Sequence, residues 1–440
     1  MALGRLFNAQ SVAVVGASAN PAKTGHTILA NMIGGGYTGQ VYPINPGSSE
    51  ILGLQAYPSV SLVPGDIDLA VVCVPSRLVP GVIEECGEKG VGAAVVISGG
   101  FREIGEEGLE AELVRAARRH GVRIVGPNCQ GVNYTPAGLC ASWPLITKKG
   151  PMAIVSQSGT IGAALAMRAE EEGIGFSAFV SLGNKVDVDE VDLLRYFADD
   201  VSTQVICMYL EGVTDGRAFM AAAREASGKK GVVVLKGGKT RAGRRAAQSH
   251  TRSVAGSDEA FTAACRQSGV SQVSDIDQLY DAGKALGALK RPGGRRLFVV
   301  TSSGGSGILA TDAAEMAGLE VPSLPEDLSW DLASRLPGHC VVGNPLDLTG
   351  DADAERYGLV LDMVMDRPDV FDACVVIFGD PIAGASSVIE RVSSITQKPL
   401  VISYLGGGDV EKEETRLIQR LGIPVFPTPE RAVRAFGLTL

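Results

Sequence analysis

The chain has 440 residues, more than a single hydrophobic core usually organises, so we expect two to four domains. Its net charge of -9 at pH 7 argues against a nucleic-acid-binding or anionic-membrane surface. No apolar run reaches the roughly 18 residues of a membrane span, and no basic, apolar leader opens the sequence, so we expect a cytoplasmic protein.

The first block of the chain alternates short apolar runs with helix-like stretches. Because these runs are continuously apolar, they are typical of strands buried on both faces of a parallel sheet. They read "SVAVVGAS", "QVYPINP", "DLAVVCVP", "GAAVVISGG" and "VRIVGPN". The pattern predicts a doubly wound α/β domain.

The turn after the first strand is not a good dinucleotide site. A nicotinamide-binding fold requires G-x-G-x-x-G and an acidic residue about 20 positions later. Here Gly16 is followed only by Gly25, and the loop between them carries Lys23. Asn45 stands at the end of the second strand, where the acidic residue is expected. A larger, phosphate-bearing ligand fits this loop better, although an NAD(P)-dependent oxidoreductase stays an alternative.

The second and third blocks begin alike, with a strand, a Ser/Gly turn and a helix. The turns "SQSG" (156–159) and "SSGGSG" (302–307) each place free backbone N–H groups and the positive end of a helix at a sheet edge. They are candidate phosphate sites, although tight-turn chemistry alone also explains them. The candidate phosphate ligands are Ser156, Gln157, Ser158, Gly159, Ser303, Gly304, Gly305 and Ser306. The polar stretches at 147–152 and 290–296 predict domains over 1–146, 147–291 and 292–440.

Ten motifs in order resemble one family over nearly the whole chain. They are "VGASANPAKTG", "VYPINP", "VPSRLV", "ISGGF", "GPNCQG", "SQSG", "LGNKVDVDEVDLL", "YLEG", "KGGKTRAGRRAAQSHTRSVAGSD" and "GNPLDLTG". The chain is similar to the α subunits of ADP-forming acyl-CoA synthetases, acetate–CoA ligase among them, which are relatives of succinyl-CoA synthetase. The resemblance implies a Rossmann-like CoA-binding domain followed by two flavodoxin-like parallel α/β domains.

The resemblance also implies which residues contact coenzyme A. These are Gly16, Ser18, Lys23, Gly25, Asn45, Pro46, Val74, Pro75, Ser98, Gly99, Asn128 and Cys129. We interpret Cys129 as a small packed residue and not as a nucleophile, because the family's intermediates are phosphorylated. The eight cysteines contain no CxxC pair, and we expect neither a metal site nor a disulfide framework.

The family's phosphorylated histidine corresponds to His250, and the carboxylate that orients it corresponds to Glu211. Neutral imidazole is a good nucleophile near pH 7, and a carboxylate on one ring nitrogen leaves the other free to attack. The Gly- and Ala-rich stretch over 241–256 is expected to be a loop that carries the phosphorylated ring between two sites.

The implied reaction is acyl-CoA + phosphate + ADP ⇌ carboxylic acid + CoA + ATP, through an acyl phosphate and a phosphohistidine. Nothing in the chain resembles an ATP-grasp domain, so Mg-ADP or Mg-ATP is expected on a separate β subunit in an α2β2 heterotetramer. Arg252 stands where the family usually has glycine, and this difference leaves a non-catalytic CoA-sensing protein as an alternative function. The sequence does not identify the acyl group.

Overall fold

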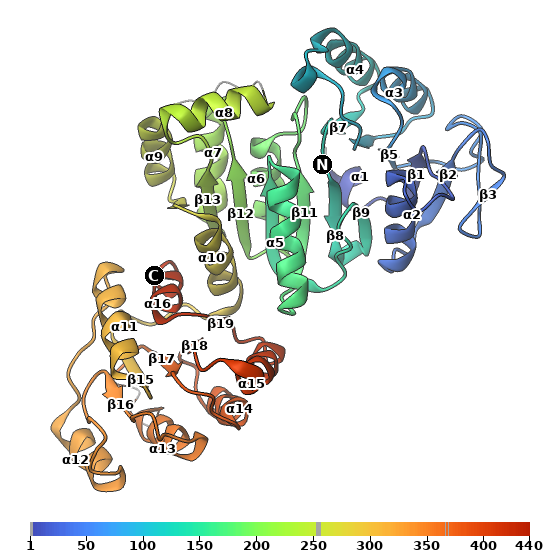
Figure 1. The fold of residues 1–440 in the computed structure, drawn as a ribbon. Helices are drawn as coiled ribbons and strands as arrows, with labels where there is room; N and C mark the ends of the chain where they lie inside the picture. The colour runs from blue at the N-terminus through green and yellow to red at the C-terminus, as the bar shows by residue number, and fades with distance from the viewer. Residues whose placement is uncertain (1–2, 252–256, 366, 368) are drawn as a thin grey trace. The chain divides into compact units, whose positions relative to one another are not determined.

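The computed structural model describes residues 3–251, 257–365, 367 and 369–440, with the backbone alone for 248–251. Contacts divide the chain into two compact units. Unit 1 comprises residues 1–171 and 175–275, and unit 2 comprises residues 172–174 and 276–440. The predicted α/β architecture is confirmed, with three sheets built largely from parallel strands (Figure 1).

The first sheet of unit 1 has five parallel strands in the order β2-β1-β5-β6-β7. Its apolar runs form strands because both faces are covered, α3 and α4 on one face and α1 and α2 on the other. The elements of this block are β1 (Ser11–Val15), β2 (Gln40–Ile44), β5 (Leu69–Val72), β6 (Ala93–Val96), β7 (Arg123–Val125), α1 (Gly4–Phe7), α2 (Thr24–Gly34), η1 (Ser76–Leu78), α3 (Val79–Glu88), η2 (Arg102–Ile104) and α4 (Glu107–His120), with a small hairpin of β3 (Glu50–Ile51) and β4 (Leu54–Gln55).

The second sheet of unit 1 has seven strands in the order β14-β13-β12-β10-β11-β8-β9. Strands β8 and β9 come from residues 131–142 and extend the sheet as an antiparallel hairpin beside β11. One continuous hydrophobic core joins the two sheets, for example through Val12 and Val155. The elements are β8 (Gly131–Tyr134), η3 (Thr135–Ala137), β9 (Leu139–Ser142), β10 (Lys149–Ser156), α5 (Gly159–Glu171), β11 (Phe176–Ser181), α6 (Glu190–Asp199), β12 (Val205–Leu210), α7 (Gly216–Ser227), β13 (Gly231–Lys236), α8 (Arg241–Thr251), α9 (Asp258–Gln267) and β14 (Ser271–Val273).

Unit 2 holds a five-stranded parallel sheet in the order β16-β15-β17-β18-β19. Two separate apolar clusters cover its two faces, as expected for continuous apolar strands. The elements are α10 (Ile276–Ala288), β15 (Leu297–Thr301), α11 (Gly304–Met316), α12 (Glu326–Arg335), β16 (Leu346–Asp347), α13 (Ala354–Met365), β17 (Ala373–Phe378), α14 (Ala385–Ile395), β18 (Leu400–Tyr404), α15 (Gly408–Arg420), β19 (Val425–Phe426) and α16 (Pro429–Gly437).

None of the described helices combines the length and the apolar character that a membrane crossing needs. The longest of them, α4, has 14 residues, whereas about 20 are required.

Candidate functional site

The turns that follow the strands of the first sheet all lie at one edge. Because the five strands are parallel, their carboxyl ends meet there, and this is where open α/β sheets bind ligands. Every residue that the resemblance assigned to coenzyme A lies in one of these turns, apart from Gly25, which is in the first turn of the helix that follows β1. They follow β1 (Gly16, Ser18, Lys23, Gly25), β2 (Asn45, Pro46), β5 (Val74, Pro75), β6 (Ser98, Gly99) and β7 (Asn128, Cys129).

The first of these turns requires glycine at both ends. Gly16 has φ +87°, a conformation that residues with a side chain rarely adopt. Helix α2 then packs so closely on the turn that a Cβ at Gly25 would overlap the carbonyl oxygen of Gly16 and lie 2.8 Å from its carbon. Lys23 is exposed at the start of α2, where its ammonium adds to the positive end of the helix.

Asn45 uses its side chain to brace the same turn. Its amide nitrogen donates to the carbonyl oxygen of Ala17 at 2.8 Å, and its amide oxygen accepts from the Gly47 N–H at 2.8 Å. A carboxylate cannot donate the first of these bonds. The geometry therefore explains why an amide stands where a dinucleotide-binding fold would have an acidic residue.

The turns after β5, β6 and β7 are bonded to one another. The Ser98 hydroxyl donates to the carbonyl oxygen of Val74 at 2.5 Å, and the Asn128 N–H donates to the carbonyl oxygen of Ser98 at 2.9 Å. Asn128 has φ +60°, which Asn tolerates better than most residues. These three turns form one rim at the sheet edge, and Pro75 opens the short helix η1 beside it.

Cys129 is buried beneath this rim. Its Sγ lies 3.3 Å from the carbonyl oxygen of Val96, and burial raises the pKa of its thiol to about 12. A thiol with this pKa stays protonated near neutral pH and is a poor nucleophile. The surroundings of Cys129 are therefore those of a packing residue.

The "SQSG" turn joins β10 to α5 at the carboxyl edge of the second sheet. The Ser156 hydroxyl donates to the Ser158 carbonyl oxygen at 2.5 Å, and the Gln157 N–H donates to the Tyr209 carbonyl oxygen at 2.9 Å. A Cβ at Gly159 would lie 2.6 Å from the Cγ of Gln130, so the turn after β7 abuts the start of α5. The candidate CoA and phosphate turns of unit 1 are thus neighbours.

Glu211 lies on the next turn of the same edge, after β12, and is 5% exposed. The side-chain oxygen of Gln157 accepts from the N–H groups of Glu211 at 2.8 Å and Gly212 at 3.2 Å. Burial and the hydrogen-bonded Glu211 carboxylate raise the pKa of Tyr209 to about 12, so its hydroxyl stays a donor to that carboxylate. Gln157, predicted as a phosphate ligand, thus also orients the Glu211 turn.

His250 lies in the last turn of helix α8, and its side chain is outside the part of the chain that the structure describes, as is Arg252. The expectation of a loop over 241–256 was wrong for residues 241–251. Arg, Ala and Gln dominate this stretch and are strong helix formers. Helix α8 contacts η2, which follows β6 of the first sheet.

The corresponding turn of unit 2 also caps a helix. The Ser303 hydroxyl accepts from the Ser306 N–H at 3.4 Å and from the Ser306 hydroxyl at 3.1 Å. Gly304 and Gly305 are exposed at the start of α11. However, a Cβ at Gly304 would lie 2.8 Å from an oxygen of Asp347, so a carboxylate already shares the positive end of this helix.

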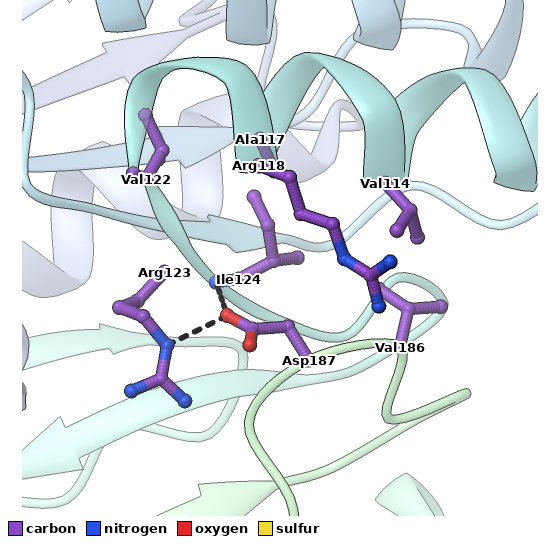
Figure 2. A pocket seen from close by; sticks show the side chains of 9 residues that line it. Val114, Ala117, Arg118, Val122, Arg123, Ile124, Val186 and Asp187 are labelled. Atoms are coloured by element: carbon purple, nitrogen blue, oxygen red, sulfur yellow. Dashed lines mark hydrogen bonds and ion pairs between the residues drawn. The ribbon is translucent and has the colours of Figure 1, made fainter.

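A pocket of about 250 Å³ lies between the end of α4 and the segment that follows β11 (Figure 2). Arg123 and Asp187 face each other beside it, with Nε and Oδ2 2.8 Å apart, and Arg118 leans over it. The pocket is at the amino end of β7, opposite the turns described above. It is therefore not where this fold is expected to bind coenzyme A.

Three residues near these turns were missed from the sequence. Gln130 adjoins the start of α5, Asn184 is buried against the turn after β7, and Asp347 adjoins the start of α11. All three stand inside recognised motifs, "GPNCQG", "LGNKVDVDEVDLL" and "GNPLDLTG", which was the available signal. Among the described residues, no group of three or more His, Cys, Asp or Glu side chains forms a metal site.

Three family models match the chain in succession. They are a CoA binding domain over residues 10–135, a succinyl-CoA ligase like flavodoxin domain over 149–286 and a Ligase-CoA domain over 297–439. These matches follow the order of the three sheets.

Sequence relatives and a solved structure are both similar to this chain over nearly its whole length. The α subunit of acetate–CoA ligase [ADP-forming] I from Pyrococcus furiosus is 44% identical, over 99% of this chain and 97% of the relative. The α subunit of acetate–CoA ligase [ADP-forming] II from the same organism is 39% identical, over 98% and 96%. A solved structure of the dinucleotide forming acetyl-coenzyme A synthetase 1 of Candidatus Korarchaeum cryptofilum, in complex with phosphate and ADP, is 41% identical with a TM-score of 0.93, over 100% and 96%. The chain therefore belongs to the family of α subunits of ADP-forming acyl-CoA ligases.

Proposed function

We propose that this chain is the α subunit of an ADP-forming acyl-CoA synthetase, with His250 as the phosphorylated residue. The reaction is acyl-CoA + phosphate + ADP ⇌ carboxylic acid + CoA + ATP. A separate ATP-grasp β subunit supplies the site for Mg-ADP, and the two subunits assemble as α2β2. The protein acts in the cytoplasm.

One observation carries the proposal most strongly: three turns with different chemistry adjoin within unit 1. The turn after β7 would hold the thioester end of acyl-CoA, and it contacts the "SQSG" turn through Gln130 and Gly159. The "SQSG" turn is also hydrogen-bonded to the Glu211 turn, through the side-chain oxygen of Gln157. The turns that would hold the thioester, the phosphate and the carboxylate that orients His250 therefore adjoin one another, and this supports the proposal.

The chemistry follows from these placements. A phosphate oxygen attacks the thioester carbonyl carbon, the C–S bond breaks, and the CoA thiolate leaves and takes up a proton. A nitrogen of His250 then attacks the phosphorus of the acyl phosphate, and the carboxylate leaves. The N–H of the other ring nitrogen donates a hydrogen bond to the Glu211 carboxylate. This bond fixes the tautomer and stabilises the positive charge on the phosphorylated ring. The phosphoryl group finally passes to ADP on the partner.

Backbone donors supply the anion stabilisation in this scheme. The start of α5 offers the N–H groups of its first turn and the positive end of the helix to phosphate. The turn from Ser303 to Ser306 is the second phosphate cradle, and Asp347 beside it would lower its affinity for a free anion. We therefore assign the incoming phosphate to the α5 turn.

The test is acyl-CoA-dependent phosphorylation of His250. The purified chain is incubated with phosphate and a panel of acyl-CoA thioesters, and intact-mass spectrometry follows the gain of one phosphoryl group. His250→Ala is the control. An adduct that depends on His250 supports the proposal, and the thioester that reacts fastest names the acyl group. CoA binding without any adduct, even with a candidate ATP-grasp partner and ATP, would favour a CoA sensor.

A further inference from the structure

Lys185 lies in the segment between β11 and α6 and has an unusual backbone conformation. Its φ is +45°, in the left-handed region that residues with long side chains rarely adopt. Such conformations cost free energy and persist only where the surroundings impose them, most often near functional sites. The contacts of this segment show what imposes it here.

The backbone on both sides of Lys185 is held by the turn after β7 and by β7 itself. The Asn184 N–H donates to the Pro127 carbonyl oxygen at 2.8 Å, and the Val186 N–H donates to the Gly126 carbonyl oxygen at 3.1 Å. Further along, the Asp187 carboxylate accepts from the Ile124 N–H at 2.8 Å and from Arg123 Nε at 2.8 Å (Figure 2). The segment is thus pinned to the structure that would hold the thioester end of acyl-CoA.

The Lys185 side chain points to the other turn of the site. Its Nζ donates to the Gly212 carbonyl oxygen at 2.6 Å and to Glu190 Oε2 at 2.8 Å. The side chain of Lys185 is 4% exposed and that of Glu190 is fully buried. The Glu211–Gly212 turn is therefore held from two sides, with Gln157 accepting from its N–H groups and Lys185 donating to its carbonyl oxygen.

Stability alone does not explain this buried ion pair. Taking two charges out of water costs about as much as their attraction returns, and well-packed apolar residues often replace such pairs without loss. In addition, the second carboxylate oxygen of Glu190 is buried, and none of the residues that the structure describes donates a hydrogen bond to it. A role in fixing one geometry accounts for both the strained backbone and the incompletely bonded charge.

We propose that Lys185 is a positioning residue that ties the Glu211 turn to the turn after β7. It acts through Glu211, and it keeps the carboxylate that orients His250 at a set distance from the thioester. This inference rests on the proposed function, because it assigns Lys185 a part in the phosphorylation of His250.

The test compares rates of His250 phosphorylation in variants of the full chain. Lys185→Met alone leaves Glu190 as an unpaired buried charge, so the double change Lys185→Met with Glu190→Gln is the informative variant. We expect it to bind CoA within about twofold of wild type and to lose about 10- to 100-fold in rate, the usual scale for a displaced catalytic group. Lys230→Met is the matched control, since Lys230 also donates to two backbone carbonyl oxygens, those of Asp200 and Thr203, but at the amino edge of the sheet.

A double-mutant cycle separates positioning from general damage. If Lys185 acts through Glu211, the double change Lys185→Met with Glu190→Gln should alter the rate by less than about twofold in a Glu211→Gln background. A folded double variant that phosphorylates His250 at the wild-type rate would overturn the inference, and so would a further tenfold loss in the Glu211→Gln background. Absence of phosphorylation in the wild type would instead overturn the proposed function, and this inference with it.

Discussion

Gly25→Ala is the sharpest test of the candidate CoA site. A Cβ at this position would overlap the carbonyl oxygen of Gly16 and lie 2.8 Å from its carbon and 3.2 Å from the Cα of Ala17. All three atoms belong to the backbone, so no side chain can rotate away. The start of α2 or the turn from Gly16 to Lys23 must move.

The expected magnitude follows from this overlap. Forcing an extra carbon into a packed site costs about 1–3 kcal/mol. Because the displaced atoms form the predicted phosphate-contacting loop, we expect CoA to bind at least about tenfold more weakly, equivalent to about 1.4 kcal/mol. Isothermal titration calorimetry with CoA and thermal unfolding of the same samples measure both effects.

Gly34→Ala in the same helix is the matched control. Outside the neighbouring residues and backbone of α2 itself, no described atom lies within 4 Å of a Cβ at Gly34, and the residue is exposed, so alanine should raise stability by up to about 1 kcal/mol and leave CoA affinity unchanged. If Gly25→Ala bound CoA within twofold of wild type and unfolded at the same temperature, the assignment of this loop would be wrong.

Four further predictions concern individual side chains. Glu211→Gln should slow phosphorylation of His250 by about 100-fold or more at unchanged CoA affinity, because an amide leaves the imidazolium without its counter-charge. Tyr209→Phe should slow the same reaction severalfold. Rates equal to that of the wild type, measured by mass spectrometry of quenched samples, would contradict both predictions. Cys129→Ala should keep the phosphorylation rate within a few fold of the wild-type rate. Peptide mapping should find that Cys129 is alkylated far more slowly in the folded chain than in the unfolded chain, because burial raises the pKa of its thiol to about 12. Hydrogen bonds from Arg296 lower the pKa of Asp372 in the folded state, so their stabilisation is present at neutral pH and is lost as pH falls through that lowered pKa. Asp372→Asn should therefore destabilise unit 2 by about 1–2 kcal/mol at pH 7 in denaturant unfolding. The difference should shrink as the pH is lowered below the ordinary Asp pKa of 3.8 and through the lowered value, whereas a pH-independent difference would refute the linkage.

Much of the architecture followed from local pattern. Strands such as β1 and β10 were identified because each contains an uninterrupted apolar run, "VAVV" in β1 and "MAIV" in β10, which is typical of a sheet covered on both faces. The candidate CoA residues fall at one edge for the same reason, since parallel strands end on the same side. Asn45 could be marked as unsuited to a dinucleotide ribose from its side-chain chemistry alone.

Two other features were not predicted from the sequence, for different reasons. Helix α8 replaced an expected loop because residue propensity outweighed glycine content over 241–251. The hairpin of residues 131–142 joined the second sheet by pairing with β11, more than 40 positions later in the chain. Local sequence carries no record of such pairing partners.

Lys185 shows the same limit at the level of one side chain. In the sequence it is a lysine in a charged stretch, a pattern that is typical of a solvated surface. In the folded chain its neighbours are bonded to the turn after β7, and its ammonium is buried between Glu190 and Gly212. The sequence alone determined the types of domain, the order of the turns and the candidate reactive residues. Only the tertiary structure decided which turns touch and which buried charge holds them, because those contacts join residues that are distant in the chain.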